Sequence, residues 1–239
     1  MRLATANRID CRASSRTRAR DTHRHFRAVA HASASSGDDE SAVVRRVMDF
    51  ARTDARTLND AVDASTQADI DRLIASGRVD GGISNAVRGD GKWEVFCAPH
   101  IQRLAVPLGV RFAPLSYDIR DGKIRSDVRH RGIVPDGWLS ASGTVVAGQE
   151  MEAEGKTRPS CVIQFDKFWI GAGMTQDEPR DFPRGEEASA VDRAIDALGN
   201  AGFLDAFAKF PVLFYDEKEG LVIFQFPPLA SNICARLAK

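Results

Sequence analysis

Residues 111–130 read RFAPLSYDIRDGKIRSDVRH, and this stretch decides the fold class. Before the Asp121–Gly122 pair, Leu115, Tyr117 and Ile119 recur at every second position, and after it apolar or small residues alternate with charged ones. An Asp-Gly pair between two alternating runs is typical of a β-hairpin with a two-residue turn. The stretch therefore predicts two antiparallel strands with one face toward water.

Further segments with strand character surround this hairpin. Their short connections favour antiparallel neighbours, and they do not alternate with helices as a parallel sheet requires. We therefore predict a mainly β fold (α+β) in which an antiparallel sheet is strongly curved or closed into a barrel, because closure removes exposed edges. The further strand segments are GKWEVFC (91–97), GWLSASGTVV (137–146), SCVIQFDKFWI (160–170) and the second hairpin PVLFYDEKEGLVIFQF (211–226).

The segment 160–170 carries the clearest division into two faces. With a period of two, Cys161, Ile163, Phe165 and Trp169 share one face, which we predict to be the inner one. Asp166 then falls on the opposite face, toward solvent.

Helical periodicity occurs in two regions outside the strands. Residues 37–90 hold two apolar patterns at helical spacing and form a predicted helical lead-in. Residues 91–239 form the predicted barrel domain, interrupted by a helical insertion at 186–209 with a stripe of Val191, Ala194, Ile195 and Leu198.

Residues 1–36 differ in composition from the rest. They carry eight Arg and no Lys against two Asp, a net charge of +6, and since the whole chain is neutral the remainder carries −6. An Arg-, Ser- and Ala-rich segment without an apolar core indicates a disordered organelle transit peptide rather than a secretory signal. Its Ser and Thr content favours the chloroplast over the mitochondrion. The alternative is a disordered basic arm that binds nucleic acid, which the acidic remainder disfavours.

The sequence offers little catalytic chemistry. Outside the first 36 residues the histidines are His100, expected in a loop, and His130, expected on the surface. The remaining cysteines Cys97, Cys161 and Cys234 are odd in number and lack a CxxC spacing, so we expect buried thiols rather than a zinc site or a disulfide framework. We therefore predict no catalytic residues, no metal and no cofactor, and no enzyme activity.

Aromatic side chains are the remaining signal. The inward residues of a small barrel either fill its core or line a pocket for one small ligand, and the small residues at 140–143 favour a pocket by leaving volume unfilled. The predicted ligand-binding residues are Trp93, Val95, Tyr117, Trp138, Phe165, Trp169 and Phe224.

The chain also resembles a known family. GKWEVFCAPHI (91–101) is similar to the strand that opens the plastid-lipid-associated protein (fibrillin) domain, and Phe210–Pro211 followed by Tyr215–Asp216–Glu217 is similar to its closing element. The resemblance covers about residues 45–226. It implies a lipocalin-like barrel in a chloroplast carrier or structural protein of thylakoids and plastid lipid globules (plastoglobules).

These observations together predict a function. We expect a non-enzymatic plastid protein that binds an apolar small molecule (a lipid, prenyl quinone or carotenoid) in the stroma, at the thylakoid surface or on plastoglobules, with peripheral membrane contact. No run of 18 apolar residues is present, so we expect no transmembrane segment, and we expect no nucleic-acid partner. One alternative is an assembly partner of a photosynthetic complex with a solid barrel. Another is a lipid isomerase or cyclase that uses Asp166 and His130.

Overall fold

The computed structural model describes residues 39–53, 57–81, 90–107, 109–132, 135–173, 178–202 and 208–238. The transit peptide predicted for residues 1–36 lies outside these residues, as does the part of the predicted insertion at 203–207.

Most of the described chain is β-structure. Its strands are β1 (Gly91–Cys97), β2 (Arg111–Phe112), β3 (Leu115–Arg120), β4 (Lys123–Arg131), β5 (Gly137–Ala147), β6 (Met151–Ala153), β7 (Lys156–Arg158), β8 (Ser160–Ala172), β9 (Lys209–Asp216), β10 (Leu221–Phe226) and β11 (Ser231–Leu237).

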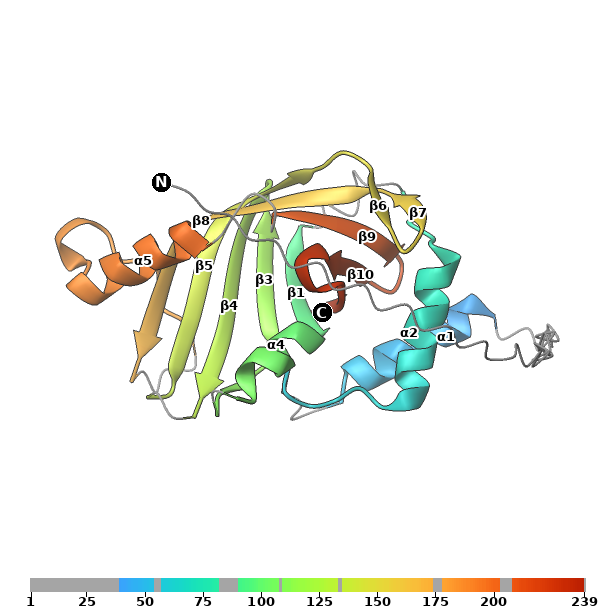
Figure 1. Ribbon diagram of the computed structural model, residues 1–239, viewed down its shortest axis with the longest axis horizontal. Coiled ribbons are helices and arrows are strands. Elements are labelled where there is room, and N and C mark those ends of the chain that lie inside the picture. Colours follow the sequence, from blue (N-terminus) through green and yellow to red (C-terminus); the bar gives the residue numbers. More distant parts are fainter. Residues whose placement is uncertain are drawn as a thin grey trace, which may run out of the picture. The chain divides into compact units, whose positions relative to one another are not determined.

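Eight of these strands form a closed barrel (Figure 1). Their order is β4-β3-β1-β11-β10-β9-β8-β5, and pairing of β5 with β4 completes the ring. All neighbours are antiparallel, and β2 adds to β4 while β6 and β7 form a separate hairpin. The prediction of a mainly β, antiparallel barrel is confirmed, and this geometry is compatible with a lipocalin-like fold.

Both predicted hairpins are confirmed. Arg120 pairs with Lys123 across a two-residue turn, in which Asp121 and Gly122 have φ of 51° and 72°. Two positive φ angles are what a type I′ turn requires, and Gly and Asp tolerate them best. β9 and β10 are joined through the residues 217–220, where Gly220 has φ of 69°.

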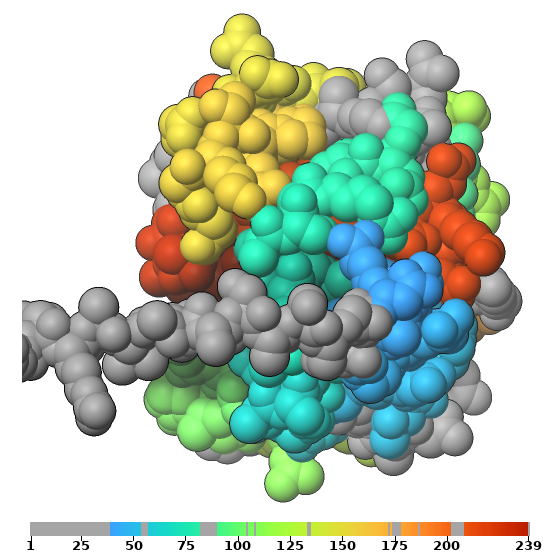
Figure 2. All heavy atoms as spheres, turned by 90° about the vertical axis from the view of Figure 1, so that its right-hand side faces the viewer, coloured from blue at the N-terminus to red at the C-terminus, as the bar shows by residue number. Residues whose placement is uncertain are grey.

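Helices cover part of the outside of the barrel. Helix α1 (Glu40–Ala51) and helix α2 (Ala64–Ser76) bury their apolar faces against the outer side of β9 and β10, and Figure 2 shows them side by side on that face. Helix α4 (Pro99–Ala105) follows β1, helix α5 (Ala190–Gly202) follows β8, and short 3-10 turns lie at Gly185–Glu187 and Pro227–Leu229. The cluster beneath α1 and α2 includes Val44, Val47, Leu73, Leu213 and Ile223.

A β-bulge interrupts the pairing of β5 with β8. Gly143 lies opposite Phe165, whereas its neighbour Ser142 lies opposite Lys167, so Asp166 is an extra residue on β8. The strands approach so closely here that a Cβ on Gly143 would lie 1.9 Å from the carbonyl oxygen of Gln164. An extra residue reverses the face to which all later side chains of a strand point.

This reversal overturns one prediction from the sequence. Trp169 was expected on the same face as Ile163, but it pairs with Ser140, which pairs with Asp127. On β4, Asp127 is three residues from Ile124, whose side chain points into the barrel interior. Since alternate residues of a strand point to opposite sides, Asp127, Ser140 and Trp169 all point outward. The prediction that Trp169 points inward is therefore wrong, since a period of two cannot register a bulge.

The bulge glycine gives a stability test. We expect Gly143→Ala to lower the free energy of unfolding by about 1–3 kcal/mol, the usual cost of placing extra carbon in filled space. Chemical denaturation measures the change. Ser142→Ala, one residue away on the other face, is the matched control and should stay within about 0.5 kcal/mol of wild type. Equal effects of the two substitutions would contradict the close approach at Gly143.

Candidate functional site

The barrel interior contains a small cavity at the end where β8 and β9 pair, which we call the closed end. Its volume is about 40 Å³, and since a buried water needs about 10–15 Å³ on this measure, it has room for only a few water molecules. The lining residues are Trp93, Tyr117, Ile119, Ile124, Val145, Cys161, Ile163, Val212, Val222, Phe224 and Ala235.

Five of the seven predicted ligand-binding residues gather in this interior. Trp93, Tyr117 and Phe224 line the cavity. Val95 belongs to the same buried apolar cluster, and the half-buried Phe165 packs against it. The structure thus places these five side chains around one core, and ligand binding by them remains a prediction.

The other two predicted residues lie on the opposite face of the sheet. Trp138 pairs with Gly171, in the same alternating row as Trp169. Trp169 is buried beneath the segment 178–184: its indole Nε1 donates a hydrogen bond to the carbonyl oxygen of Arg180 at 3.0 Å, and the ring of Phe182 meets it edge-on at 5.5 Å. Trp169 therefore fastens that segment to the outside of the barrel and does not line the cavity.

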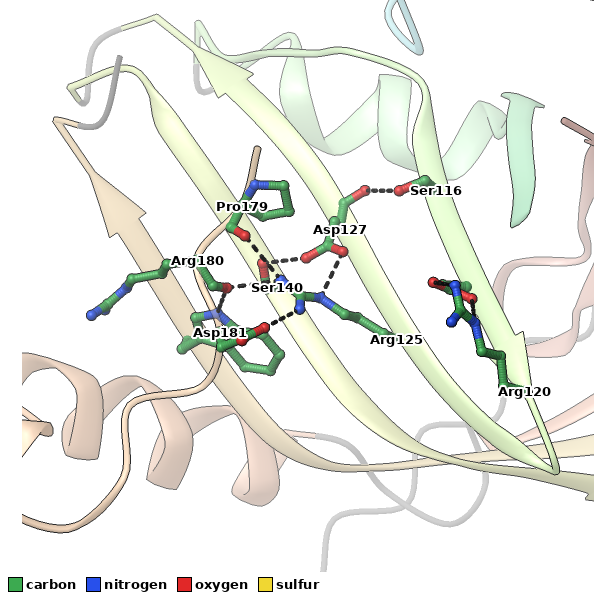
Figure 3. Close-up of polar contacts among 10 residues, drawn as sticks. Ser116, Arg120, Arg125, Asp127, Ser140, Pro179, Arg180 and Asp181 are labelled. Carbon is green, nitrogen blue, oxygen red and sulfur yellow. Dashed lines mark hydrogen bonds and ion pairs between the residues drawn. The ribbon is translucent and has the colours of Figure 1, made fainter. Parts of the chain in front are cut away.

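Arg125 on β4 is the second anchor of this segment (Figure 3). Its guanidinium donates to Asp127 at 2.9 Å and to Asp181 at 2.5 Å. It also donates to the carbonyl oxygens of Pro179 and Arg180, at 3.2 and 2.8 Å. One planar cation thus satisfies two carboxylates and two backbone acceptors, as the guanidinium geometry permits.

This network could not be predicted from the sequence, because its partners are about 55 residues apart. Only the alternation of Arg125 and Asp127 with apolar residues was visible, and it predicted a solvated face.

Part of the β8 edge has no partner strand among the described residues, and we call this part the seam. Within the described part of the chain β8 pairs with β9 over Ser160–Val162, and the N–H of Ile163 donates to the carbonyl oxygen of Ala208 at 2.8 Å. Further along, the backbone N–H of Phe168 donates to the carboxylate of Asp196 on α5 at 2.9 Å, and the carbonyl of Ile170 accepts from Arg180 at 2.7 Å. Side chains therefore take the place of a neighbouring strand, which is one way to protect an edge from pairing with another chain.

Helix α5 faces the seam with its polar side. Asp192 is buried and forms an ion pair with Arg180, and within the predicted apolar stripe Ile195 is half-buried whereas Ala194 is exposed. Val191 and Leu198 of that stripe are 62% and 69% exposed. The helix thus presents part of its apolar stripe to solvent beside the seam, whereas a surface helix usually buries such a stripe.

The inner surface of the barrel is also accessible at the end away from the cavity, which we call the open end. Leu139 pairs with Val128 on one side and Ile170 on the other. On β4, Val128 is four residues from the cavity-lining Ile124, so both side chains point inward, and Leu139 opposite Val128 does the same. Leu139 is nevertheless 40% exposed, so apolar inner surface reaches solvent next to the seam.

Both histidines lie in less solvated places than expected. His130 is buried, so the prediction of a surface histidine is wrong; the strand pattern showed its charged neighbours but not the inner face that it occupies. His100 lies in α4 rather than in a loop. Its ring stacks on Phe226 at 4.8 Å, and its Nδ1 is 3.2 Å from the hydroxyl of Ser231. Burial lowers the pKa of His130, and burial together with a nearby arginine lowers the pKa of His100 to about 4.

The structure does not bring the two alternative catalytic candidates together. His130 aligns with Gly137, and Gly137 aligns with Ala172, six residues along β8 from the exposed Asp166. At about 3.3 Å per residue the two lie roughly 20 Å apart along the sheet. Within the described ranges, no three His, Cys, Asp or Glu residues are grouped as a metal site would need. None of the described helices is long and apolar enough to cross a membrane.

Comparison with protein-family models, with curated protein sequences and with solved structures finds no match to this chain.

Loss of the Arg125 anchor should release the segment 178–184. We expect Arg125→Gln to speed tryptic cleavage after Arg184 by about tenfold, equivalent to about 1.4 kcal/mol of local opening. Time-resolved proteolysis with mass spectrometry measures it. The control is Arg120→Gln, since Arg120 is exposed and, among the described residues, forms its ion pair with the neighbouring Asp118. Unchanged cleavage in Arg125→Gln would show that Trp169 holds the segment alone.

The lowered pKa of His100 makes stability depend on pH. Between pH 6.5 and about 4 the unfolded state binds a proton at His100 that the folded state does not bind. The contribution of His100 to the free energy of unfolding is therefore at its maximum above pH 6.5 and decreases as the pH falls toward 4. We expect His100→Phe, which keeps the stacking on Phe226, to reduce the fall in Tm between pH 7 and 5. Differential scanning fluorimetry measures this. A variant with the same pH dependence as wild type would assign the effect to other groups.

Proposed function

We propose that this chain is a non-enzymatic binding protein for an apolar small molecule, such as an acyl lipid, a prenyl quinone or a carotenoid, held at the open end of the barrel. The exposed inner-face residue Leu139, beside the seam, carries this proposal. Burying such apolar surface against a ligand is worth about 25 cal/mol per Å². No covalent step is involved.

The closed end has a different role in this proposal. A cavity of about 40 Å³ does not admit a lipid chain, because ligand pockets usually have volumes of several hundred Å³. Trp93, Tyr117 and Phe224 would form the floor against which the ligand ends.

Helix α5 would guide the ligand between a lipid phase and the barrel. Its exposed Val191 and Leu198 lie on the helix that caps the seam, and apolar side chains of this kind insert into the interface of a lipid surface. The net negative charge of residues 37–239 disfavours electrostatic attachment to anionic lipid. The resemblance to plastid-lipid-associated proteins and the Arg-rich first 36 residues support a chloroplast location, at thylakoids or plastoglobules.

A charge at the open end tests the binding site. We expect Leu139→Lys to weaken binding of decyl-plastoquinone, followed by quenching of tryptophan fluorescence, by at least about tenfold, since the ligand would bury an ammonium group. Val146→Lys is the matched control: Val146 is on the same strand and 53% exposed, but it neighbours the inward Val145 and so points outward. Equal quenching in both variants would place the ligand elsewhere.

One observation favours a second candidate function. The packed closed end suits a solid barrel whose outer surface binds a photosynthetic complex as an assembly partner. Organic extraction of the protein isolated from its own cells, followed by mass spectrometry, separates the two. A prenyl lipid or pigment near one per chain supports the carrier, whereas a clean extract together with no quenching by decyl-plastoquinone supports the partner.

A further inference from the structure

Cys97 and Cys234 lie opposite each other where β1, the first strand of the barrel, pairs with β11, the last. Cys97 at the end of β1 is the register partner of Cys234 in β11, and their thiols share a hydrogen bond. Side chains directly opposite in an antiparallel pair have Cβ atoms about 4.5–5.5 Å apart, and a disulfide needs about 3.5–4.5 Å. Only a small movement of the two side chains toward each other is therefore needed to form a disulfide.

The backbone next to Cys97 allows that approach. The register shifts between Val95 and Cys97, where two residues of β1 oppose one of β11. A bulge is a place where regular ladder pairing is already interrupted, so a local adjustment there does not disturb the rest of the strand pair.

A pocket connects this pair to solvent. It has a volume of about 140 Å³ and lies between α2, α4 and the start of β11. Several small molecules of the size of water or hydrogen peroxide fit in such a volume. The pocket is lined by Gln67, Ile70, Cys97, Pro99, Arg103, Ala230, Ser231, Asn232 and Cys234.

We propose that Cys97 and Cys234 are a reversible redox pair, which a hydroperoxide converts into a cross-strand disulfide. Cys97 is 5% exposed and Cys234 is fully buried, so Cys97 meets the oxidant first. This site is separate from the barrel interior and does not depend on the ligand proposed above.

The reaction balances in two steps. The Cys97 sulfur attacks one peroxide oxygen, the O–O bond breaks, and Cys97 sulfenic acid and one water or alcohol form. The Cys234 sulfur then attacks the Cys97 sulfur, the S–O bond breaks, and a second water leaves with the thiol proton. The two thiols are oxidised by two electrons and the peroxide is reduced by two. A dithiol reverses the bond by exchange and becomes a disulfide itself.

The disulfide would join β1 to β11 covalently and stabilise the barrel. A cross-link between residues so distant in sequence restricts the unfolded chain. The hydrogen bond with Cys97 and burial raise the pKa of Cys234, so its thiolate is scarce and it attacks the sulfenic acid more slowly than an exposed thiol would.

The test uses the full chain. The reduced protein is exposed to hydrogen peroxide, alkylated under denaturing conditions and digested without reductant for mass spectrometry. We expect a mass loss of about 2 Da, a peptide linking Cys97 to Cys234, a rise in Tm of about 5–15 °C, and full reversal by dithiothreitol. Cys161→Ala is the matched control, because burial raises the pKa of Cys161 to about 12 and it lines the separate interior cavity. That variant should keep the whole response, and Cys97→Ala and Cys234→Ala should each lose it.

Two results would overturn the proposal. One is wild-type protein in which both Cys97 and Cys234 are alkylated, or oxidised beyond sulfenic acid, without a cross-link. The other is a cross-link that maps to another cysteine pair. Both results are read on the wild-type chain, so they hold even where a cysteine variant fails to fold.

Discussion

The single extra residue on β8 determines how the two faces of this barrel are used. Before Asp166, odd-numbered side chains such as Ile163 point inward; after it, Trp169 points outward. The close approach at Gly143 leaves no room for a Cβ, so the bulge depends on glycine there. A strand without the bulge would place Trp169 inside the barrel and remove the apolar anchor for the segment 178–184.

The seam follows from the same strand. β8 pairs with β5 over nearly all of its length, but among the described residues its ladder with β9 covers three residues, and backbone groups beyond a ladder must find other hydrogen-bond partners. Asp196 and Arg180 supply them from α5 and from the segment before it. The polar side of α5 is therefore used on the barrel, which explains why Val191 and Leu198 are left in solvent.

The two ends of the barrel consequently differ in physical character. The closed end is a filled apolar core around a cavity of about 40 Å³, as expected for an eight-stranded barrel of this size. The open end exposes Leu139 on its inner surface. The carrier role proposed above depends on this difference, since a ligand can reach apolar inner surface at the open end but finds a filled core at the closed end.

The sequence by itself determined the features that depend on neighbouring residues. The Asp121–Gly122 turn, the alternation beside it and the second hairpin follow from local backbone preference, and together they determined an antiparallel sheet. Five of the seven predicted ligand-binding residues also reached the interior, since period two holds wherever a strand is regular. Only the tertiary structure decided the outward position of Trp169, the burial of His130 and the pairing of Cys97 with Cys234. Each of these depends on the register between strands distant in sequence, and register is set by packing over the whole barrel rather than by any local pattern.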